Sequence, residues 1–404
     1  MATAFKEQII QGKMIGGPGW SANDVTDFFG DKLYGIPCSA VEKDGDPLGR
    51  IVHDYGYHSR GSYSINAAHS STRITYTSFK ETVKIMDGVK YLIKADLKSG
   101  FRQFGTHPVD WRFQVYCNGP TEHYIDIACP FGRTNSPLEF CPCVELLTKS
   151  IMIRYDEEFL SRPSLGSYGD DIFGGFKRDT RYDSALQLRN YICSQGKQLT
   201  LEFNMDVLKT PLPARIQTIL GRRYNTHCRR IETDGKKVTK YVQKIEQFLR
   251  KRYATRYEFE SLHGSLNYVA DIEPFGRPFL ALLTRATARH KLTELIHVSP
   301  EIKRGLLIWK EILRRNKGIA MDFVLGRLPT AKSNIWVDAS TSWGIGGCCG
   351  YHYFQIPWKN MEQIRTRTIA HKELLACIVA MFTFRKYIRN SWVKLFTDNS
   401  NVYY

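Results

Sequence analysis

Two adjacent carboxylates stand at the centre of the segment Leu165-Gly166-Ser167-Tyr168-Gly169-Asp170-Asp171-Ile172-Phe173-Gly174-Gly175-Phe176. Small or turn-forming residues surround Asp170 and Asp171, and apolar residues flank them on both sides. This pattern predicts a β-hairpin whose turn presents the carboxylates to a cleft. Such a hairpin can hold hard divalent cations, which prefer oxygen ligands, against a phosphate-bearing substrate. Because an acidic pair after glycine is also common in surface turns, the assignment depends on the rest of the chain.

The composition favours a globular protein with a polyanionic partner. The chain has 404 residues, which is long enough for two or three domains that each bury a core. Hydrophobic residues make up 43% and aromatic residues 13%, and no segment has the composition of a disordered region. The formal net charge of +17 indicates nucleic acid as the most common kind of partner. A basic protein without such a partner is the alternative.

The cysteines and the hydropathy pattern indicate in which cellular compartment the protein is expected. Ten cysteines include no C-x-x-C pair, so we interpret them as buried free thiols in a reducing compartment. Residues 1–23 lack the continuous apolar core of a secretory leader. No segment approaches the run of about 20 apolar residues that a membrane span needs. We therefore expect a soluble intracellular protein, cytoplasmic or nuclear, with no membrane partner.

The pattern of apolar residues, turns and charges divides the chain into four expected parts. These are a loosely attached lead-in (1–45), a region of alternating strands and helices (46–210), a basic and mainly helical region (211–328), and a final domain of strands and helices (329–404). The expected strands are 91–96, 112–116, 124–127, 199–203, 334–338 and 393–398, and the expected helices are 138–154, 184–194, 259–269, 277–287 and 368–387.

The most basic segment is 222–256, where twelve Lys or Arg residues stand against three Asp or Glu residues. Tyr241, Phe248, Tyr253 and Tyr257 lie among these charges. Cations with interleaved aromatic rings are what a helix needs to grip a nucleic-acid backbone. A solvated helix face is the alternative interpretation of such a charge run.

A third carboxylate, Asp96, ends an expected strand and is followed by Leu97-Lys98-Ser99-Gly100-Phe101. If this strand pairs with the Asp170-Asp171 hairpin in one sheet, the acids come together. Two divalent ions about 3.5–4 Å apart could then activate a 3′-hydroxyl and stabilise a leaving pyrophosphate in an in-line transfer.

The order of these motifs resembles a known family. The segments Lys94-Ala95-Asp96-Leu97-Lys98-Ser99-Gly100-Phe101, Pro130-Phe131-Gly132 with Asn135-Ser136-Pro137, and Tyr168-Gly169-Asp170-Asp171 are similar to consecutive motifs of retroelement reverse transcriptases, in particular gypsy-type and DIRS-type elements. The resemblance covers roughly residues 45–404, and the ordered set is far more specific than any single motif. It implies an α+β right-hand polymerase with fingers, an antiparallel palm sheet and a thumb. The implied activity is RNA-directed DNA polymerisation with two Mg²⁺ or Mn²⁺ ions per active site. The implied partners are an RNA template, a DNA primer, the RNA–DNA hybrid and dNTPs.

The resemblance assigns roles to the acids and to one lysine. Asp96 and Asp170 match metal ligands, and Asp171 matches a supporting carboxylate at the metal site. Lys209 matches a lysine that could protonate the leaving pyrophosphate. The segment Ile219-Leu220-Gly221 looks like the turn that grips the primer.

Four further residues match substrate-binding positions. Phe101 matches the aromatic gate that would collide with a ribose 2′-hydroxyl and so favour deoxynucleotides, with a core phenylalanine as the alternative. Arg50 matches a fingers residue that meets the triphosphate, since a guanidinium offers paired donors to phosphate oxygens. A surface arginine is the alternative there. Phe131 and Gly132 look like the element that packs against the incoming nucleotide and the template.

A second acidic set, Asp338, Glu373 and Asp398, is similar to the active site of ribonuclease H. Two of these acids end strands and Glu373 lies on an expected helix. That site also uses two divalent ions, which direct water at an RNA phosphate. Since the family's last acid lies on a segment after the Asp398 strand, we expect an incomplete ribonuclease H-like α/β domain in a fragment of a larger polyprotein.

Two other functions fit part of the pattern. An RNA-dependent RNA polymerase also uses Gly-Asp-Asp, but Phe101 and the second acidic set argue against it. A decayed or domesticated copy that serves as a nucleic-acid-binding scaffold would fit the truncation and the loose pattern around Lys209. The intact Asp96, Asp170 and Asp171 argue against that alternative.

Overall fold

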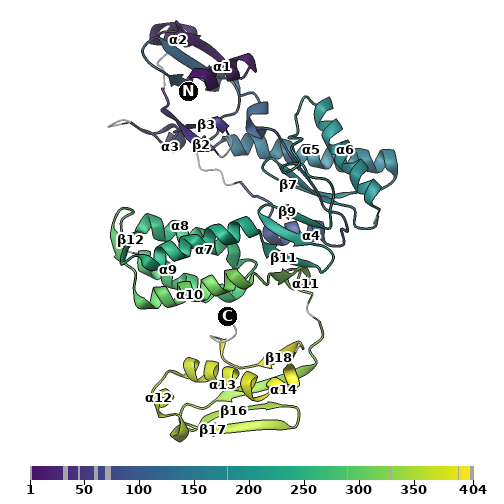
Figure 1. Cartoon of the computed structure of the whole chain (residues 1–404), viewed down its shortest axis with the longest axis vertical. Helices are drawn as coiled ribbons and strands as arrows, with labels where there is room; N and C mark the ends of the chain where they lie inside the picture. Colours follow the sequence, from purple (N-terminus) through teal and green to yellow (C-terminus); the bar gives the residue numbers. More distant parts are fainter. Residues whose placement is uncertain are drawn as a thin grey trace. The chain divides into compact units, whose positions relative to one another are not determined.

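The computed structural model describes residues 2–30, 35–43, 46–58, 62–68, 74–179, 181–288, 290–327, 329–389 and 391–400. The chain divides into two compact units, Met1–Leu325 and Gly326–Tyr404, and each is described by itself (Figure 1). Among the described residues, no helix is both long enough and apolar enough to cross a membrane.

The first unit is organised around a three-stranded antiparallel sheet of order β4-β8-β7. Its strands are β4 (Ile93–Asp96), β7 (Ser164–Tyr168) and β8 (Asp171–Gly175). Helices α5 (Ser136–Phe159) and α6 (Tyr182–Gln198) pack against this sheet and share its apolar core (Figure 1). The arrangement is the antiparallel sheet with helices that the sequence predicts for a polymerase palm.

Residues expected to form a loosely attached lead-in belong instead to a second sheet. Strand β1 (Met14–Pro18) pairs with β6 (Glu122–Asp126), which pairs with β5 (Val115–Cys117). Helix α1 (Ala2–Ile10) buries Phe5 in the core beside this sheet, and α2 (Ala22–Phe29) follows β1. The sequence did not predict the short strand β1 because Gly16, Gly17 and Pro18 interrupt its apolar alternation.

Two further groups of elements complete this unit. The strands β9 (Ile216–Ile219), β10 (Arg222–Asn225), β11 (Arg230–Thr233) and β14 (Ile319–Ala320) form an antiparallel sheet that shares a core with α4 (Phe79–Met86). The helices α7 (Gly235–Arg250), α8 (Arg256–Ala270), α9 (Arg277–Thr287) and α10 (Pro300–Arg315) bury a common core that includes Trp309 (Figure 1). The short strands β12 (Tyr253–Thr255) and β13 (Leu295–His297) pair next to them.

The remaining elements of the first unit are short. The strands β2 (Cys38–Lys43) and β3 (Asp46–His53) form a hairpin. The small helices are α3 (Ile65–Ala68), η1 (Gly100–Gln103), η2 (Pro108–Phe113), η3 (Pro274–Gly276) and α11 (Met321–Val324).

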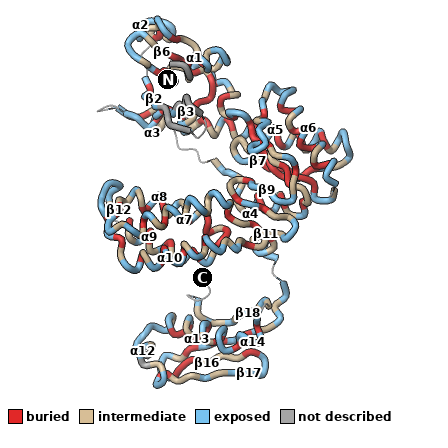
Figure 2. The backbone as a smooth tube through the Cα atoms, in the orientation of Figure 1, coloured by how far each residue is buried: buried red, intermediate tan, exposed pale blue. Residues whose placement is uncertain are grey.

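The second unit has a mixed sheet of order β17-β16-β15-β18. Its strands are β15 (Ser333–Ala339), β16 (Gly344–Cys349), β17 (His352–Pro357) and β18 (Val393–Phe396), and β15 and β18 run parallel. Helix α13 (Ile369–Thr383) packs on the face formed by Ile335, Val337 and Ala339, so these positions are buried while the intervening ones are exposed. Buried and exposed stretches alternate along the elements of this unit (Figure 2). The small helices are η4 (Trp358–Asn360), α12 (Glu362–Arg365) and α14 (Arg385–Ile388).

Two of the expected strands are wrong in part or entirely. The strand expected at 112–116 begins only at Val115, because Pro108 starts the 3₁₀ helix η2 that extends to Phe113. The strand expected at 199–203 does not form; Phe203 makes only an isolated bridge to Leu97, and Thr200 has a φ of 58°. A left-handed residue inside the segment breaks the extended backbone that a strand requires.

Candidate active sites

The pairing of β4 with β8 brings the predicted acids of the first unit together. Asp96 lies directly opposite Asp171 in the antiparallel register, and Asp170 occupies the turn before β8. The Leu97 amide donates to the Asp170 carbonyl at 3.0 Å, which ties the turn to the end of β4. The turn itself needs Gly169, whose φ is 57°.

Asp96 is the anchor of this cluster. It is 7% exposed, and its amide donates to Thr210 Oγ1 at 3.1 Å. Lys209 Nζ lies 3.6 Å from Asp96 Oδ1, while the Lys209 side chain remains half exposed. The structure therefore places the predicted lysine beside the predicted metal ligand.

Asp171 pairs with a lysine that, unlike Lys209, is itself largely buried. Lys94 Nζ lies 3.2 Å from Asp171 Oδ1, and both side chains are largely buried. Lys94 was not among the predicted site residues, although it stands two positions before Asp96 on a strand and so faces the same side. A supporting carboxylate, as predicted for Asp171, is consistent with this pairing.

The electrostatics of the cluster suit a cation. Burial raises the pKa of Asp170, and the neighbouring charge of Asp96 adds to this effect. Burial also raises the pKa of Asp171, against the lowering effect of Lys94. Three carboxylates from neighbouring positions supply the oxygen ligands that divalent cations prefer, and a bound cation would offset the cost of burying their charge. The residues present therefore fit Mg²⁺ or Mn²⁺.

The predicted gate residue lies among aromatic rings. Phe101 is half-buried and stacks on Phe140 with 4.3 Å between ring centroids, and its ring lies 5.2 Å from that of Phe131. Gly132 has a φ of 93°, and a Cβ there would lie 2.8 Å from the His53 carbonyl oxygen. The structure thus brings Phe101 and Phe131 together and explains why position 132 requires glycine.

Arg50 lies on β3, and its side chain is outside the described residues, so its predicted contact with a triphosphate stays a prediction.

The predicted primer-grip turn joins β9 to β10. Leu220 and Gly221 have φ values of 51° and 72°, and the Leu220 carbonyl accepts a hydrogen bond from the Tyr268 hydroxyl at 2.7 Å. Arg222 lies between the rings of Phe79 and Tyr268, 4.0 and 4.8 Å from their centroids. These contacts anchor the hairpin tip to the helical part of the unit.

Many cations of the basic segment 222–256 bind protein groups. Ion pairs join Arg222 to Asp271, Arg223 to Glu232, Arg229 to Asp87 and Asp322, Lys251 to Glu258, and Arg256 to Glu260. Lys236 and Lys240, on α7, are exposed and form no ion pair with a described carboxylate. Tyr253 and Tyr257 are exposed, whereas Phe248 is part of the core. If this segment binds nucleic acid, only its few exposed side chains can make the contact.

The second unit brings its three predicted acids together. Asp338 on β15, Glu373 on α13 and Asp398 after β18 each offer an oxygen, and these oxygens all lie within 4.8 Å of one another. In the described part of the chain, no other set of three potential ligand residues is this close. A cavity of about 720 Å³ adjoins Asp338 and Asp398, on the sheet face that carries Trp336.

Glu373 has the features of a metal ligand. It is buried, its Oε1 accepts from the Ala339 amide at 3.2 Å, and its Oε2 has no hydrogen-bond partner among the described residues. Burial raises the pKa of Glu373, and the charges of Asp338 and Asp398 raise it further. An unpartnered buried carboxylate oxygen is costly unless something supplies positive charge, so the three acids fit a divalent ion.

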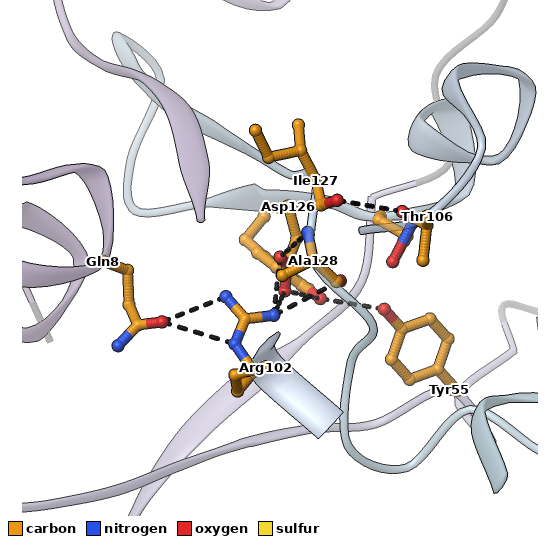
Figure 3. A network of polar contacts seen from close by, with 9 residues as sticks. Gln8, Tyr55, Arg102, Thr106, Asp126, Ile127 and Ala128 are labelled. Atoms are coloured by element: carbon orange, nitrogen blue, oxygen red, sulfur yellow. Dashed lines mark hydrogen bonds and ion pairs between the residues drawn. The ribbon is translucent and has the colours of Figure 1, made fainter. Parts of the chain in front are cut away.

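A buried ion pair next to the gate was missed by the sequence interpretation. Arg102, on η1, bonds to both carboxylate oxygens of Asp126, and Gln8 of α1 accepts from the same guanidinium (Figure 3). Partners this far apart in the sequence leave no local pattern, so sequence spacing alone could not have found them.

Comparison with known proteins supports the fold. No protein-family model and no curated protein matches the chain. Solved structures of a foamy viral protease-reverse transcriptase are similar, at 16% identity. The structure described as dRH in complex with double-stranded DNA has a TM-score of 0.57, and the match covers 96% of this chain and 60% of that one. A complex with double-stranded DNA has a TM-score of 0.55 and covers 97% and 72%.

A third structure, in complex with an RNA/DNA hybrid, has a TM-score of 0.55 and covers 97% of this chain and 46% of its own. The chain therefore spans less than two thirds of two of these three relatives. Their viral source does not distinguish a gypsy-type from a DIRS-type element. At this level of identity the likeness concerns the fold alone, and on that ground the chain has the α+β polymerase fold of reverse transcriptases.

Proposed function

We propose that the chain is an RNA-directed DNA polymerase, a nucleotidyltransferase from a retrotransposon polyprotein that adds dNTPs to a primer 3′-end. The observation that carries the proposal is the β4–β8 register, which sets Asp96 opposite Asp171 and ties Asp170 to the end of β4. The reverse transcriptase fold supports the same function. The foamy viral neighbours were solved with double-stranded DNA and with an RNA/DNA hybrid, which supports a primer–template as the partner here.

Each residue of the cluster has a distinct task in this proposal. Asp96 and Asp170 would hold the ions, and magnesium, when bound, would activate the 3′-hydroxyl and offset charge on the triphosphate. Lys94 neutralises Asp171 and so keeps the hairpin paired with β4. Lys209 lies beside Asp96 on a half-exposed side chain and can donate a proton to the leaving pyrophosphate.

Phe101 sets the sugar preference. Its ring is held between Phe140 and Phe131, and in this position it would exclude a ribose 2′-hydroxyl. We therefore propose dNTPs as the substrates. An RNA-dependent RNA polymerase would need the opposite preference, so a comparison of dNTP and NTP incorporation separates the two activities.

Primer extension on an RNA template with dNTPs and magnesium tests the proposal. Asp170→Asn keeps the size of the side chain and removes a charge, so extension by the wild type should disappear in this variant. Asp183→Asn, an exposed aspartate on α6, is the matched control and should extend like the wild type. Extension that persists in Asp170→Asn would contradict the proposed site.

The same assay distinguishes the scaffold alternative. If neither the wild type nor Asp170→Asn extends a primer but both bind the duplex, the chain is a nucleic-acid-binding scaffold. Binding should then weaken steeply as salt rises, because the cations of a basic protein release counterions from the phosphates.

A second activity rests on the second unit. We propose that Asp338, Glu373 and Asp398 form a ribonuclease H-like site that cleaves the RNA strand of the hybrid. The support is the close approach of their oxygens and the unpartnered Oε2 of Glu373. Magnesium, when bound, directs water at the phosphate. Cleavage of a labelled hybrid by the wild type but not by Glu373→Gln tests this activity, and cleavage that survives in the variant would contradict the assignment.

A further inference from the structure

The guanidinium of Arg102 is fixed from several sides. Its Nη1 lies 2.6 and 2.5 Å from the two carboxylate oxygens of Asp126, and 3.4 Å from the Ala128 carbonyl. Its Nε and Nη2 donate to Gln8 Oε1 at 3.3 and 3.1 Å (Figure 3). Arg102 is 8% exposed and Asp126 is fully buried. A buried, charge-assisted pair with this geometry fixes the position of the backbone that carries it.

That backbone is the 3₁₀ helix η1, which also carries the gate. Phe101 is held by ring contacts with Phe140 and Phe131. The next two side chains are held by polar bonds: Arg102 by Asp126 and Gln8, and Gln103 by the carbonyls of Lys98 and Glu202 at 2.7 and 2.9 Å. Ring contacts permit sliding, whereas hydrogen bonds define distance and direction. The polar bonds of Arg102 and Gln103 therefore constrain the backbone from which the Phe101 ring projects.

The network also connects η1 to the N-terminal elements. Gln8 lies on α1, and β1, which follows α1, pairs with β6 so that Met14 lies opposite Asp126. Tyr116 donates to Asp126 Oδ2 at 3.4 Å, and its hydroxyl lies 2.8 Å from that of Tyr55. The carboxylate that holds Arg102 thus lies on the central strand of a sheet whose edge strand β1 follows α1.

We propose that Gln8 and Arg102 are positioning residues for sugar selection, so that the N-terminal helix tunes the discrimination between dNTPs and NTPs from outside the polymerase site. This inference rests on the proposed polymerase function and on Phe101 as the gate. An aromatic gate distinguishes a hydrogen from a hydroxyl, so a displacement of a fraction of an ångström changes its selectivity. Loss of one contact to Arg102 would loosen η1 without removing the ring.

The test compares Gln8→Ala with Gln11→Ala. Gln11 follows the same helix and is exposed, and its side-chain amide donates to Glu7 Oε1 at 3.2 Å, so it is the matched control. The measured quantity is the ratio of kcat/KM for a dNTP to that for the matching NTP. In Gln8→Ala this ratio should fall by about tenfold or more, because the variant loses the two hydrogen bonds that Gln8 Oε1 accepts from the charged guanidinium.

The kinetic constants separate positioning from a general loss of structure. A loosened gate lowers the KM for the NTP and leaves kcat for the dNTP unchanged, whereas general damage lowers kcat for both substrates. Arg102→Lys keeps the charge but loses the paired donors, so its ratio should fall further. If Arg102→Lys does not fold, Gln8→Ala alone decides, because it leaves the Arg102–Asp126 pair in place.

An unchanged ratio in an active Gln8→Ala enzyme overturns the inference and leaves the polymerase proposal intact. If the wild type does not extend a primer, the polymerase proposal fails instead. Hydrogen exchange then tests the positioning itself, since the Arg102 amide donates to the Ser99 carbonyl at 2.7 Å and the Phe104 amide to the Phe101 carbonyl at 3.2 Å. Faster exchange of these amides in Gln8→Ala than in Gln11→Ala supports positioning, and equal protection contradicts it.

Discussion

The imidazole of His53 is buried at the end of β3 and stacks on Tyr116, with 4.1 Å between ring centroids. Neither ring nitrogen has a hydrogen-bond partner among the described residues. Burial, with a smaller effect of the Arg102 charge, lowers the pKa of His53 to about 3. In the unfolded chain the group titrates near its ordinary value of 6.5. Between these values the unfolded chain binds a proton that the folded chain does not.

We therefore expect the protein to lose stability as the pH falls from about 6.5 towards about 3, because protonation favours the unfolded chain in this window. His53→Phe keeps a ring against Tyr116 and removes the titration, so its melting temperature should fall less on acidification while matching the wild type at pH values above the window. Thermal melting across this range measures the effect. His58→Phe alters an exposed histidine and should retain the wild-type acid dependence; equal slopes for all three proteins would contradict the prediction.

A second prediction concerns Lys94 and Asp171. Lys94→Met leaves a largely buried carboxylate without its cation, which should destabilise the fold by about 3 kcal/mol. The double variant Lys94→Met/Asp171→Asn removes both charges and should recover much of that loss. The free energies of unfolding in urea of the wild type, the two single variants and the double variant form a double-mutant cycle. Additive effects of the two substitutions would show that the pair makes no specific contribution.

At this scale, the sequence predicts residues that belong to short motifs. Asp96, Asp170 and Phe101 fall within runs of neighbours whose order is distinctive. The structure places Lys209 beside Asp96 and ties Asp170 to the end of the same strand, while Phe101 lies against Phe140 and Phe131. Lys94 begins the motif that contains Asp96, and Arg102 directly follows it, yet the roles of both depend on partners from elsewhere in the chain. Charge pairing across strands has no sequence period, so only the structure reveals it.

Helix α5 forms although a proline, which disfavours helix, lies in its interior. It runs from Ser136 to Phe159 with Pro142 inside it, and its buried side chains include Phe140, Val144 and Leu147. An interior proline removes one backbone hydrogen bond and crowds the preceding turn. Packing of the apolar face on β7 outweighs this cost, which is why the helix begins before the proline.

Pro142→Ala should therefore stabilise the first unit by about 1–3 kcal/mol, since alanine restores the missing amide in an exposed position. Pro137, in the first turn, occupies a site that proline suits, so Pro137→Ala should change the stability by less than about 0.5 kcal/mol. The free energy of unfolding in urea measures both. If the two substitutions have equal effects, the interior proline is not a source of strain.

At the scale of elements, the sequence predicts those with a strong period. The helix expected at 277–287 is the observed α9, and the Asp170-Asp171 hairpin forms as β7 and β8. Segments with weak periodicity were predicted less well. The strand β1 exists because β6 offers it an edge, and the segment 199–203 fails as a strand because Thr200 adopts a left-handed conformation.

The whole molecule consists of two units with separate cores, and each contains its own acidic cluster. The two proposed activities should therefore be lost independently. Asp170→Asn should abolish primer extension and retain hybrid cleavage, whereas Asp338→Asn should do the reverse. Primer extension and hybrid cleavage, measured on the same preparations of the two variants, test this independence. Loss of both activities in either variant would show that the clusters depend on each other.

The direct opposition of Asp96 and Asp171 across β4 and β8 has a consequence for stability. Like charges opposite each other in a sheet oppose folding, and Asp170 adds a third. Loss of Asp171 would leave Lys94 largely buried without its partner, so only Asp96 or Asp170 could be exchanged for a neutral residue without that cost. If the proposed function is correct, such an exchange would favour folding and remove the chemistry, so stability and activity oppose each other at these two positions.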